Sequence, residues 1–124
     1  MNPLAELSDL RYLNCSGTEV SDINPIRNLN KIKEMDISNT NITDVSNLKY
    51  ANVVQSFKAD NVKINDISIV AFYKDLNNLS ISNTNVSDIN PLARCNNLST
   101  LDLSGTQVND LSILRNLLKL HDID

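Results

Sequence analysis

The residues with the most regular spacing for chemistry are five aspartates that recur every 22 residues. They are Asp22, Asp44, Asp66, Asp88 and Asp110. If the copies stack, successive carboxylates would lie about 5 Å apart, and hard oxygen ligands of this kind suit Ca²⁺. Alternatively, each aspartate side chain accepts hydrogen bonds from backbone N–H groups just before a helical turn. Calcium-binding β-rolls also use a glycine-rich nonapeptide, whereas this chain has two glycines. The sequence therefore favours the structural role and predicts no metal or other cofactor.

Nucleophilic or acid-base catalysis has little support. The single histidine, His121, lies in the truncated last copy, more than four repeats from Cys15 and more than one from Cys95, which argues against a Cys-His pair. The two cysteines are more than three repeats apart, beyond the ~7 Å Cα separation that a disulfide allows, so both are expected to be buried free thiols. Glu34 and Asp36 could form a paired-carboxylate site, although a solvated acidic area explains them more simply. We predict that the protein is not an enzyme.

A repeat of 22 residues organises all of these side chains. Full copies occupy residues 10–31, 32–53, 54–75, 76–97 and 98–119, with a half copy at 1–9 and a truncated copy at 120–124. A unit this short cannot bury its apolar side alone, so neighbouring copies must stack into a solenoid. Residues 1–124 are therefore expected to form a single domain.

Each copy begins with a short alternating stretch that is typical of a β-strand. In the first copy, Leu13 and Cys15 are expected to point inward, while Tyr12, Asn14 and Ser16 point outward. A short helical turn is expected to start at the Asn-Pro pair at 24–25. One inward position should line up side by side inside a single sheet: Leu13, Met35, Phe57, Leu79 and Leu101. The fifth copy should supply a last set of inward residues: Leu101, Leu103, Thr106, Val108, Leu111, Leu114 and Leu117.

The third copy departs from this pattern. Ala59 takes a strand core position, Val62 replaces a threonine, and Ile69 stands where other copies have proline. Small Ala51 and large Tyr73 occupy the same column in neighbouring copies. This pairing predicts that one side chain compensates for the volume of the other.

The frame L-x-x-L-x-L-x-x-T-x-V-x-D-I-x-P-L-x-x-L resembles the 22-residue leucine-rich repeats of bacterial internalins and of a nuclear regulator of protein phosphatase 1. The resemblance implies an α/β fold: a curved right-handed solenoid with a parallel β-sheet on its concave face and short 3-10 or helical turns on its convex side. That family usually has asparagine at a turn position where this chain has Thr18, Thr40, Val62, Thr84 and Thr106. Valine can neither donate nor accept a hydrogen bond, so backbone bonding should be weakest in the third copy.

The outward strand positions make the concave face a candidate binding surface, because solenoid curvature creates an extended platform. We expect a non-enzymatic protein-protein interaction module that presents this polar, acidic face to a protein partner. The residues predicted to contact the partner are Tyr12, Asn14, Glu34, Asp36, Lys58, Asp60 and Asp102.

A second surface is apolar and lies on the helical side. Tyr50 and Phe72 occupy equivalent positions one repeat apart, and Ile69 is close to Phe72 in the sequence. These side chains either cover the irregular third copy or form an exposed patch that marks an interface. The sequence leaves both interpretations open.

The ends of the array suggest the alternative function. Nothing covers the last layer, so apolar residues there should be partly exposed, namely Leu4, Leu7, Leu117, Leu118, Leu120 and Ile123. Repeat arrays normally need polar caps, and open sheet edges tend to pair. The chain could thus be a structural spacer or a self-assembling segment of a longer bacterial surface protein, or form homo-oligomers through its ends.

Charge and hydropathy exclude other partners. The formal net charge is −4 and the pI is about 4.8, whereas nucleic acids and anionic membranes attract concentrated Lys and Arg. Eighteen consecutive apolar residues occur nowhere, and the N-terminal M-N-P-L-A-E-L lacks the features of a signal peptide. The sequence therefore predicts no nucleic-acid binding and no membrane insertion, and it favours the cytoplasm.

Overall fold

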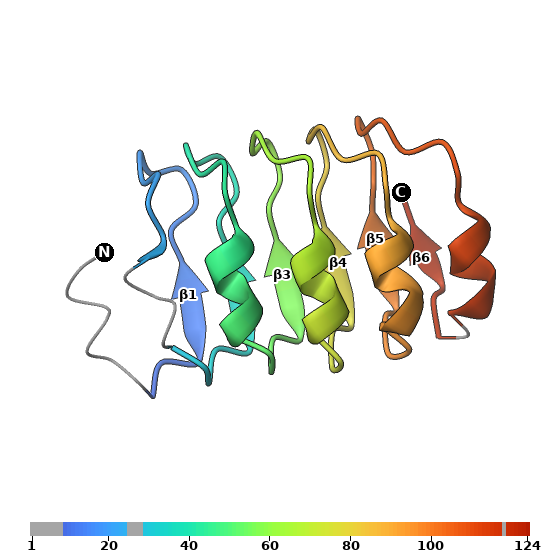
Figure 1. Cartoon of the computed structure of the whole chain (residues 1–124), viewed down its shortest axis with the longest axis horizontal. Coiled ribbons are helices and arrows are strands. Elements are labelled where there is room, and N and C mark those ends of the chain that lie inside the picture. Colours follow the sequence, from blue (N-terminus) through green and yellow to red (C-terminus); the bar gives the residue numbers. More distant parts are fainter. Residues whose placement is uncertain (1–8, 25–28, 118) are drawn as a thin grey trace.

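The computed structural model describes residues 9–24, 29–117 and 119–124. Short strands and short helices alternate along one long axis, with equivalent elements of successive copies side by side (Figure 1). In the described part of the chain, the strands form one six-stranded parallel sheet in sequence order. They are β1 (Tyr12–Asn14), β2 (Glu34–Asp36), β3 (Ser56–Lys58), β4 (Asn78–Ser80), β5 (Thr100–Asp102) and β6 (Asp122–Ile123).

The register of the sheet follows the repeat. Residues 22 positions apart pair on neighbouring strands, so the central residue of each strand lies beside its equivalents. The predicted alignment is confirmed, and its residues are Leu13, Met35, Phe57, Leu79 and Leu101. Because strand side chains alternate between faces, this column is buried while its neighbours face outward.

Four 3-10 helices form the layer opposite the sheet (Figure 1). Those in the described residues are η3 (Ser46–Tyr50), η4 (Ser68–Phe72), η5 (Asn90–Arg94) and η6 (Ser112–Asn116). The expected leucine-rich-repeat solenoid, with a parallel sheet on one side and short 3-10 turns on the other, is thus confirmed. In the first copy the helical turn expected at 24–25 falls largely on residues 25–28, which lie outside the described residues.

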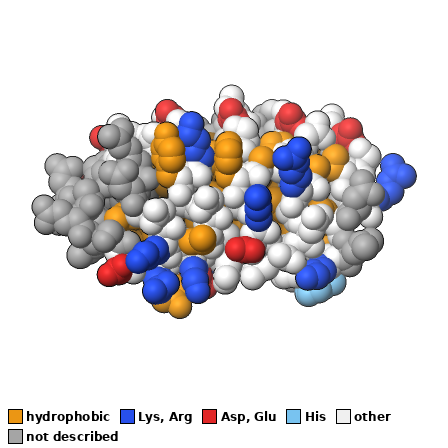
Figure 2. Space-filling model, turned by 60° about the horizontal axis from the view of Figure 1, so that its bottom comes forward, with side chains coloured by type: hydrophobic (Ala, Val, Ile, Leu, Met, Phe, Trp, Pro, Cys, Tyr) orange, Lys and Arg blue, Asp and Glu red, His pale blue; other side chains and the backbone are white. Residues whose placement is uncertain are grey.

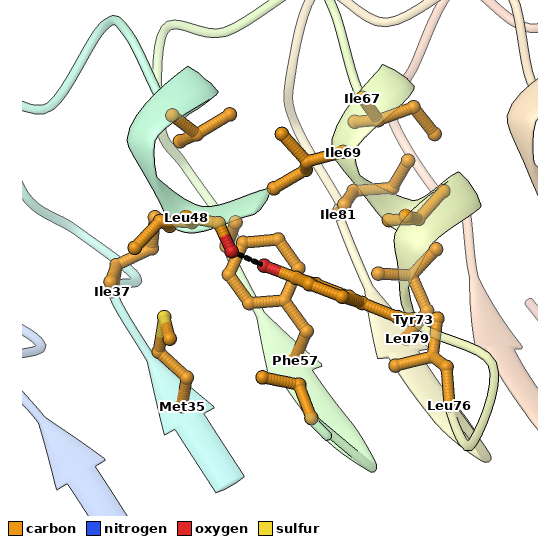
Figure 3. Close-up of a cluster of buried hydrophobic side chains, with 14 of the residues drawn as sticks. Met35, Ile37, Leu48, Phe57, Ile67, Ile69, Tyr73, Leu76, Leu79 and Ile81 are labelled. Atoms are coloured by element: carbon orange, nitrogen blue, oxygen red, sulfur yellow. Dashed lines mark hydrogen bonds between the residues drawn. The ribbon is translucent and has the colours of Figure 1, made fainter. Parts of the chain in front are cut away.

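The core fills the space between the sheet and the helices. Phe57 and Tyr73 are fully buried there, with ring centroids 6.1 Å apart and ring planes at 86°, an edge-to-face arrangement that aromatic pairs favour. Tyr73 extends into the preceding copy, where its hydroxyl donates to the Leu48 carbonyl at 2.7 Å (Figure 3). The Tyr73 ring therefore reaches towards the copy that carries the small residue Ala51, whose N–H donates to the same Leu48 carbonyl.

The last copies differ from expectation at two leucines. Leu111 is expected inside but is 50% exposed, whereas Ile67 and Ile89, which occupy the same column in the two preceding copies, are buried. Leu117 is buried in the core, as its inward position in the fifth copy predicts; the expectation that it would be partly exposed near the end is wrong. Ile123 is 49% exposed, as predicted. The expectations for Leu4, Leu7 and Leu118 lie outside the described residues.

Among the described residues, no helix has both the length and the apolar character that crossing a bilayer requires.

Candidate functional site

The outward side chains of the strands form one surface, here called the sheet face. Six of the seven residues predicted to contact a partner are outward strand residues, and Asp60 follows β3 by two positions. The strand residues are Tyr12, Asn14, Glu34, Asp36, Lys58 and Asp102. The arrangement follows from the two-residue period of a strand, which places both ends of each three-residue strand on the same face.

A hollow of about 360 Å³ lies over β1 to β4 on the sheet face. Five predicted contact residues line it: Tyr12, Asn14, Glu34, Asp36 and Lys58. Tyr12 is 64% exposed, and it is the register partner of Glu34 on the neighbouring strand. Asp102 lines a second hollow of about 270 Å³ over β3 to β5, which shares Lys58 and Asn78 with the first. Asp60 lines neither. The structure therefore brings together five of the seven residues.

Several polar residues of the sheet face stabilise the turns that follow the strands. In three copies the side-chain oxygen of the last strand residue accepts the backbone N–H two positions later, as aspartate and asparagine commonly do in turns. The donor and acceptor pairs, each at 2.9 Å, are Ser16 to Asn14, Ser38 to Asp36 and Ser104 to Asp102. These acceptors therefore have a structural role that alternation along the strand does not indicate.

Where the last strand residue is Lys58 or Ser80, a neighbouring copy supplies the acceptor instead. The Asp60 N–H donates to Ser38 Oγ at 3.0 Å. In turn, Asp60 Oδ1 accepts the Ser82 N–H at 2.8 Å and the Ser80 hydroxyl at 2.5 Å. Ser38, which alternation predicts at the surface, is buried. The sequence signal for this change of hydrogen-bond partner is Lys58, which stands in a column where other copies have a side chain that accepts a hydrogen bond.

The C-terminal half of the sheet face carries a ladder of side-chain hydrogen bonds. Asn78 Nδ2 donates to Ser56 Oγ at 3.2 Å, and Thr100 Oγ1 donates to Asn78 Oδ1 at 2.6 Å. These side chains satisfy one another across three strands. By contrast, three exposed side chains of the N-terminal half have no hydrogen bond or ion pair with any other described residue: Tyr12, Glu34 and Lys58.

The regular aspartate column has the structural role that the sequence favours. In each described copy, the Oδ1 atom accepts a backbone N–H two residues later at 2.8 to 3.0 Å; the acceptors are Asp22, Asp44, Asp66, Asp88 and Asp110. The bond from the Ser46 N–H holds the pKa of Asp44 below its usual value, and Ser112 acts in the same way on the pKa of Asp110. Within residues 9–24, 29–117 and 119–124, no three His, Cys, Asp or Glu side chains converge as a metal site would require.

The helical side presents two exposed rings. Tyr50 and Phe72 are each 52% exposed, and the Lys49 ammonium lies 5.3 Å from the centroid of the Tyr50 ring, within range of a cation-π interaction. Ile69 is only 3% exposed. Its inclusion in the apolar patch was wrong, because it packs into the core. In Figure 2, hydrophobic and basic side chains are interspersed over the visible face, and acidic ones lie mostly near its margins.

Both cysteines are free and buried. Burial raises the pKa of the Cys15 thiol and raises the pKa of Cys95 to about 11. Cys95 Sγ also donates to the Val70 carbonyl at 3.4 Å. A thiol that holds its proton so firmly is a poor nucleophile at neutral pH.

Solved structures of bacterial leucine-rich-repeat proteins are similar to the whole chain. An internalin (inlF) of Listeria monocytogenes aligns with a TM-score of 0.94 and 29% identity over 99% of this chain and 36% of its own. Internalin C2 of the same species aligns with a TM-score of 0.93 and 26% identity over 100% of this chain and 55% of its own. A leucine-rich-repeat protein of Leptospira interrogans, 19% identical, has the same fold at a TM-score of 0.87, covering 100% of this chain and 33% of its own.

No protein-family model and no curated protein sequence matches the chain. The chain spans about a third to a half of the length of the solved structures that it resembles. The 22-residue register, the parallel sheet, the row of 3-10 helices and these structural similarities agree with one another. The chain is therefore a leucine-rich-repeat protein whose fold is similar to that of the internalins.

Proposed function

We propose that this chain is a non-enzymatic recognition module that binds a protein partner on its sheet face. Internalin-like folds generally serve as protein-interaction modules. The observation that supports the proposal here is Tyr12, an exposed aromatic side chain beside Glu34 at the rim of a hollow. Tyrosine is enriched among residues that dominate binding energy, because it contributes a large, rigid, amphipathic surface.

The side chains of the sheet face would contribute unequally. Tyr12, Glu34 and Lys58 are exposed and have no hydrogen bond or ion pair with other described side chains, so they can contact a partner without losing an internal bond. Asp36, Asp60 and Asn14 each hold a turn through Oδ1. Replacing one of the latter would change the shape of the surface as well as its charge.

The experiment is a capture assay with the purified chain immobilised and substitutions made on both faces. Tyr12→Ala and Glu34→Lys should each abolish capture of a partner that the parent chain retains. Lys49→Glu, a charge reversal on the helical side, should leave capture unchanged. Circular dichroism and urea unfolding would establish that each variant is folded. Capture that survives both sheet-face substitutions in folded protein would contradict the proposal.

Self-assembly through the C-terminal end is a second candidate function. It is favoured by Ile123 in β6 and by Leu111, both about half exposed in columns that are otherwise buried. An apolar layer beside an open strand edge tends to acquire a neighbour. Light scattering over a wide concentration range would test this, with Ile123→Asp as the variant expected to reduce association. A constant monomer mass at high concentration would exclude it.

A further inference from the structure

We infer that the partner inserts an arginine side chain between Tyr12 and Glu34, an assignment that rests on the proposed function of the sheet face. These two residues are register partners on β1 and β2, so their backbones are about 4.8 Å apart and their side chains leave the sheet in the same direction. Both line the hollow of about 360 Å³. A ligand side chain lying there would touch an aromatic ring and a carboxylate at once.

The charge pattern of the sheet selects a cation at this position. Asp36 is the register partner of Lys58, so the adjacent strand places an opposite charge beside this carboxylate. Glu34 is flanked in the register by Tyr12 on one side and Ser56 on the other, neither of which is charged. Glu34 is therefore the anion of the hollow whose charge the adjacent strands leave unbalanced, and a cationic group from a partner would complement it.

Arginine fits this pair better than lysine. A planar guanidinium can stack on the face of a tyrosine ring while two of its N–H groups bond to a single carboxylate in a fork. A lysine ammonium is a more strongly hydrated point charge that cannot form the fork. The open position of Tyr12, 64% exposed, leaves ring surface for such stacking.

The remainder of the sheet face does not offer the same chemistry. Across β3, β4 and β5 the outward groups Ser56, Asn78 and Thr100 are hydrogen-bonded to one another. These groups already satisfy part of one another's hydrogen-bonding capacity, and none of them carries a charge or an aromatic ring. Specific recognition is therefore concentrated at the N-terminal half of the sheet face.

The test is an NMR titration of the isotope-labelled chain with the peptide acetyl-Gly-Arg-Gly-amide. Matched peptides carry lysine or the uncharged isostere citrulline in place of arginine. The arginine peptide should shift the amide signals of Tyr12 and Glu34, the lysine peptide should bind more weakly, and the citrulline peptide should not bind. Glu34→Gln should weaken binding about tenfold, and Tyr12→Leu about two- to fivefold. Glu19→Gln, the same substitution at an exposed site away from the hollow, should leave binding unchanged.

The outcomes separate this inference from the proposed function. Equal binding of the citrulline peptide, signal shifts located elsewhere, or no binding of the arginine peptide would overturn the arginine assignment. If the capture assay is nevertheless sensitive to Tyr12→Ala, the sheet face still binds a partner by different chemistry. If capture is insensitive as well, the proposed function fails with it.

Discussion

The Tyr73 hydroxyl donates to the Leu48 carbonyl, 2.7 Å away in the preceding copy. The Cys95 thiol makes the equivalent contact, 3.4 Å from the Val70 carbonyl, one copy later. Both donors follow a 3-10 helix directly, and both acceptors lie in the helix of the preceding copy. Side chains at this position therefore link neighbouring helices, as the strand hydrogen bonds link neighbouring strands.

Tyr73→Phe should lower the free energy of unfolding by about 1 kcal/mol, the net value of a typical buried hydrogen bond. The ring and its packing on Phe57 would remain, and the Leu48 carbonyl would still accept the Ala51 N–H at 3.1 Å. Urea unfolding monitored by circular dichroism would measure the change. Tyr50→Phe removes a hydroxyl from an exposed ring and should have little effect. Equal stability of Tyr73→Phe and the parent would show that the bond contributes nothing.

Alkaline pH should destabilise the protein through its buried thiol. Burial raises the pKa of Cys95 from 9.0 to about 11, so the folded state retains a proton that the unfolded chain releases. Stability is therefore fully present below pH 9 and declines as the pH rises towards 11, with a maximal loss of about 2–3 kcal/mol. Urea midpoints from pH 8 to 11 would be compared with those of Cys95→Ala. The variant should show a shallower decline, and parallel curves would contradict this assignment.

The fold could be predicted from sequence because its information is periodic. One inward position repeated every 22 residues, Leu13 through Leu101, fixes the strand, the register and the stacking together. The side-chain hydrogen bonds between Ser38, Asp60, Ser80 and Ser82 do not recur every 22 residues. Lys58 and Ser80 interrupt the column of carboxylate and amide acceptors; in these copies the Asp60 N–H donates to Ser38, and Asp60 accepts from Ser80 and Ser82. These bonds become visible only when three copies are placed side by side.

The candidate site was predictable in part for the same reason. Alternation places Tyr12 and Glu34 outside, and the structure agrees. Alternation along a strand cannot tell whether a side chain beyond the strand is outward or covered. It therefore places Ser38, the equivalent of Ser16, at the surface, although Ser38 is buried. Similarly, Ile69 replaces a proline in a helix and resembles its exposed neighbour Phe72 in hydrophobicity, but its helical position turns it into the core.

The threonine column provides a matched pair of substitutions. Thr84 Oγ1 donates to the Ile81 carbonyl at 2.8 Å, and three other copies have the same bond. In the third copy, buried Val62 supplies no donor at this position. Val62→Thr should therefore raise the free energy of unfolding by about 0.5–1 kcal/mol, and Thr84→Val should lower it by about 1–2 kcal/mol. Chemical denaturation of the two variants would show changes of opposite sign, and a loss in both would contradict the argument.

Acid should weaken the turns that precede the helices. Hydrogen bonds from Ser46 lower the pKa of Asp44, and those from Ser112 lower the pKa of Asp110. A lowered folded-state pKa means that the stabilisation is present above the usual value of 3.8 and is lost as the pH falls through the folded value. Asp44→Asn with Asp110→Asn retains an oxygen acceptor without a titrating group. Unfolding midpoints between pH 5 and 2 should therefore depend less on pH in this double variant than in Glu19→Gln, which removes a surface carboxylate elsewhere.

Asp60 distinguishes a structural carboxylate from a binding one. Asp60→Ala should lower the free energy of unfolding by about 1–3 kcal/mol, because the Ser82 N–H, which belongs to a buried residue, would lose its acceptor. Asp60→Asn keeps an oxygen at that place and should recover most of the stability. Lys58→Ala, on the same strand but exposed, should change stability little. If Asp60 served mainly as a partner contact, the order would differ: Asp60→Asn and Asp60→Ala would reduce capture equally, and urea unfolding would not separate them.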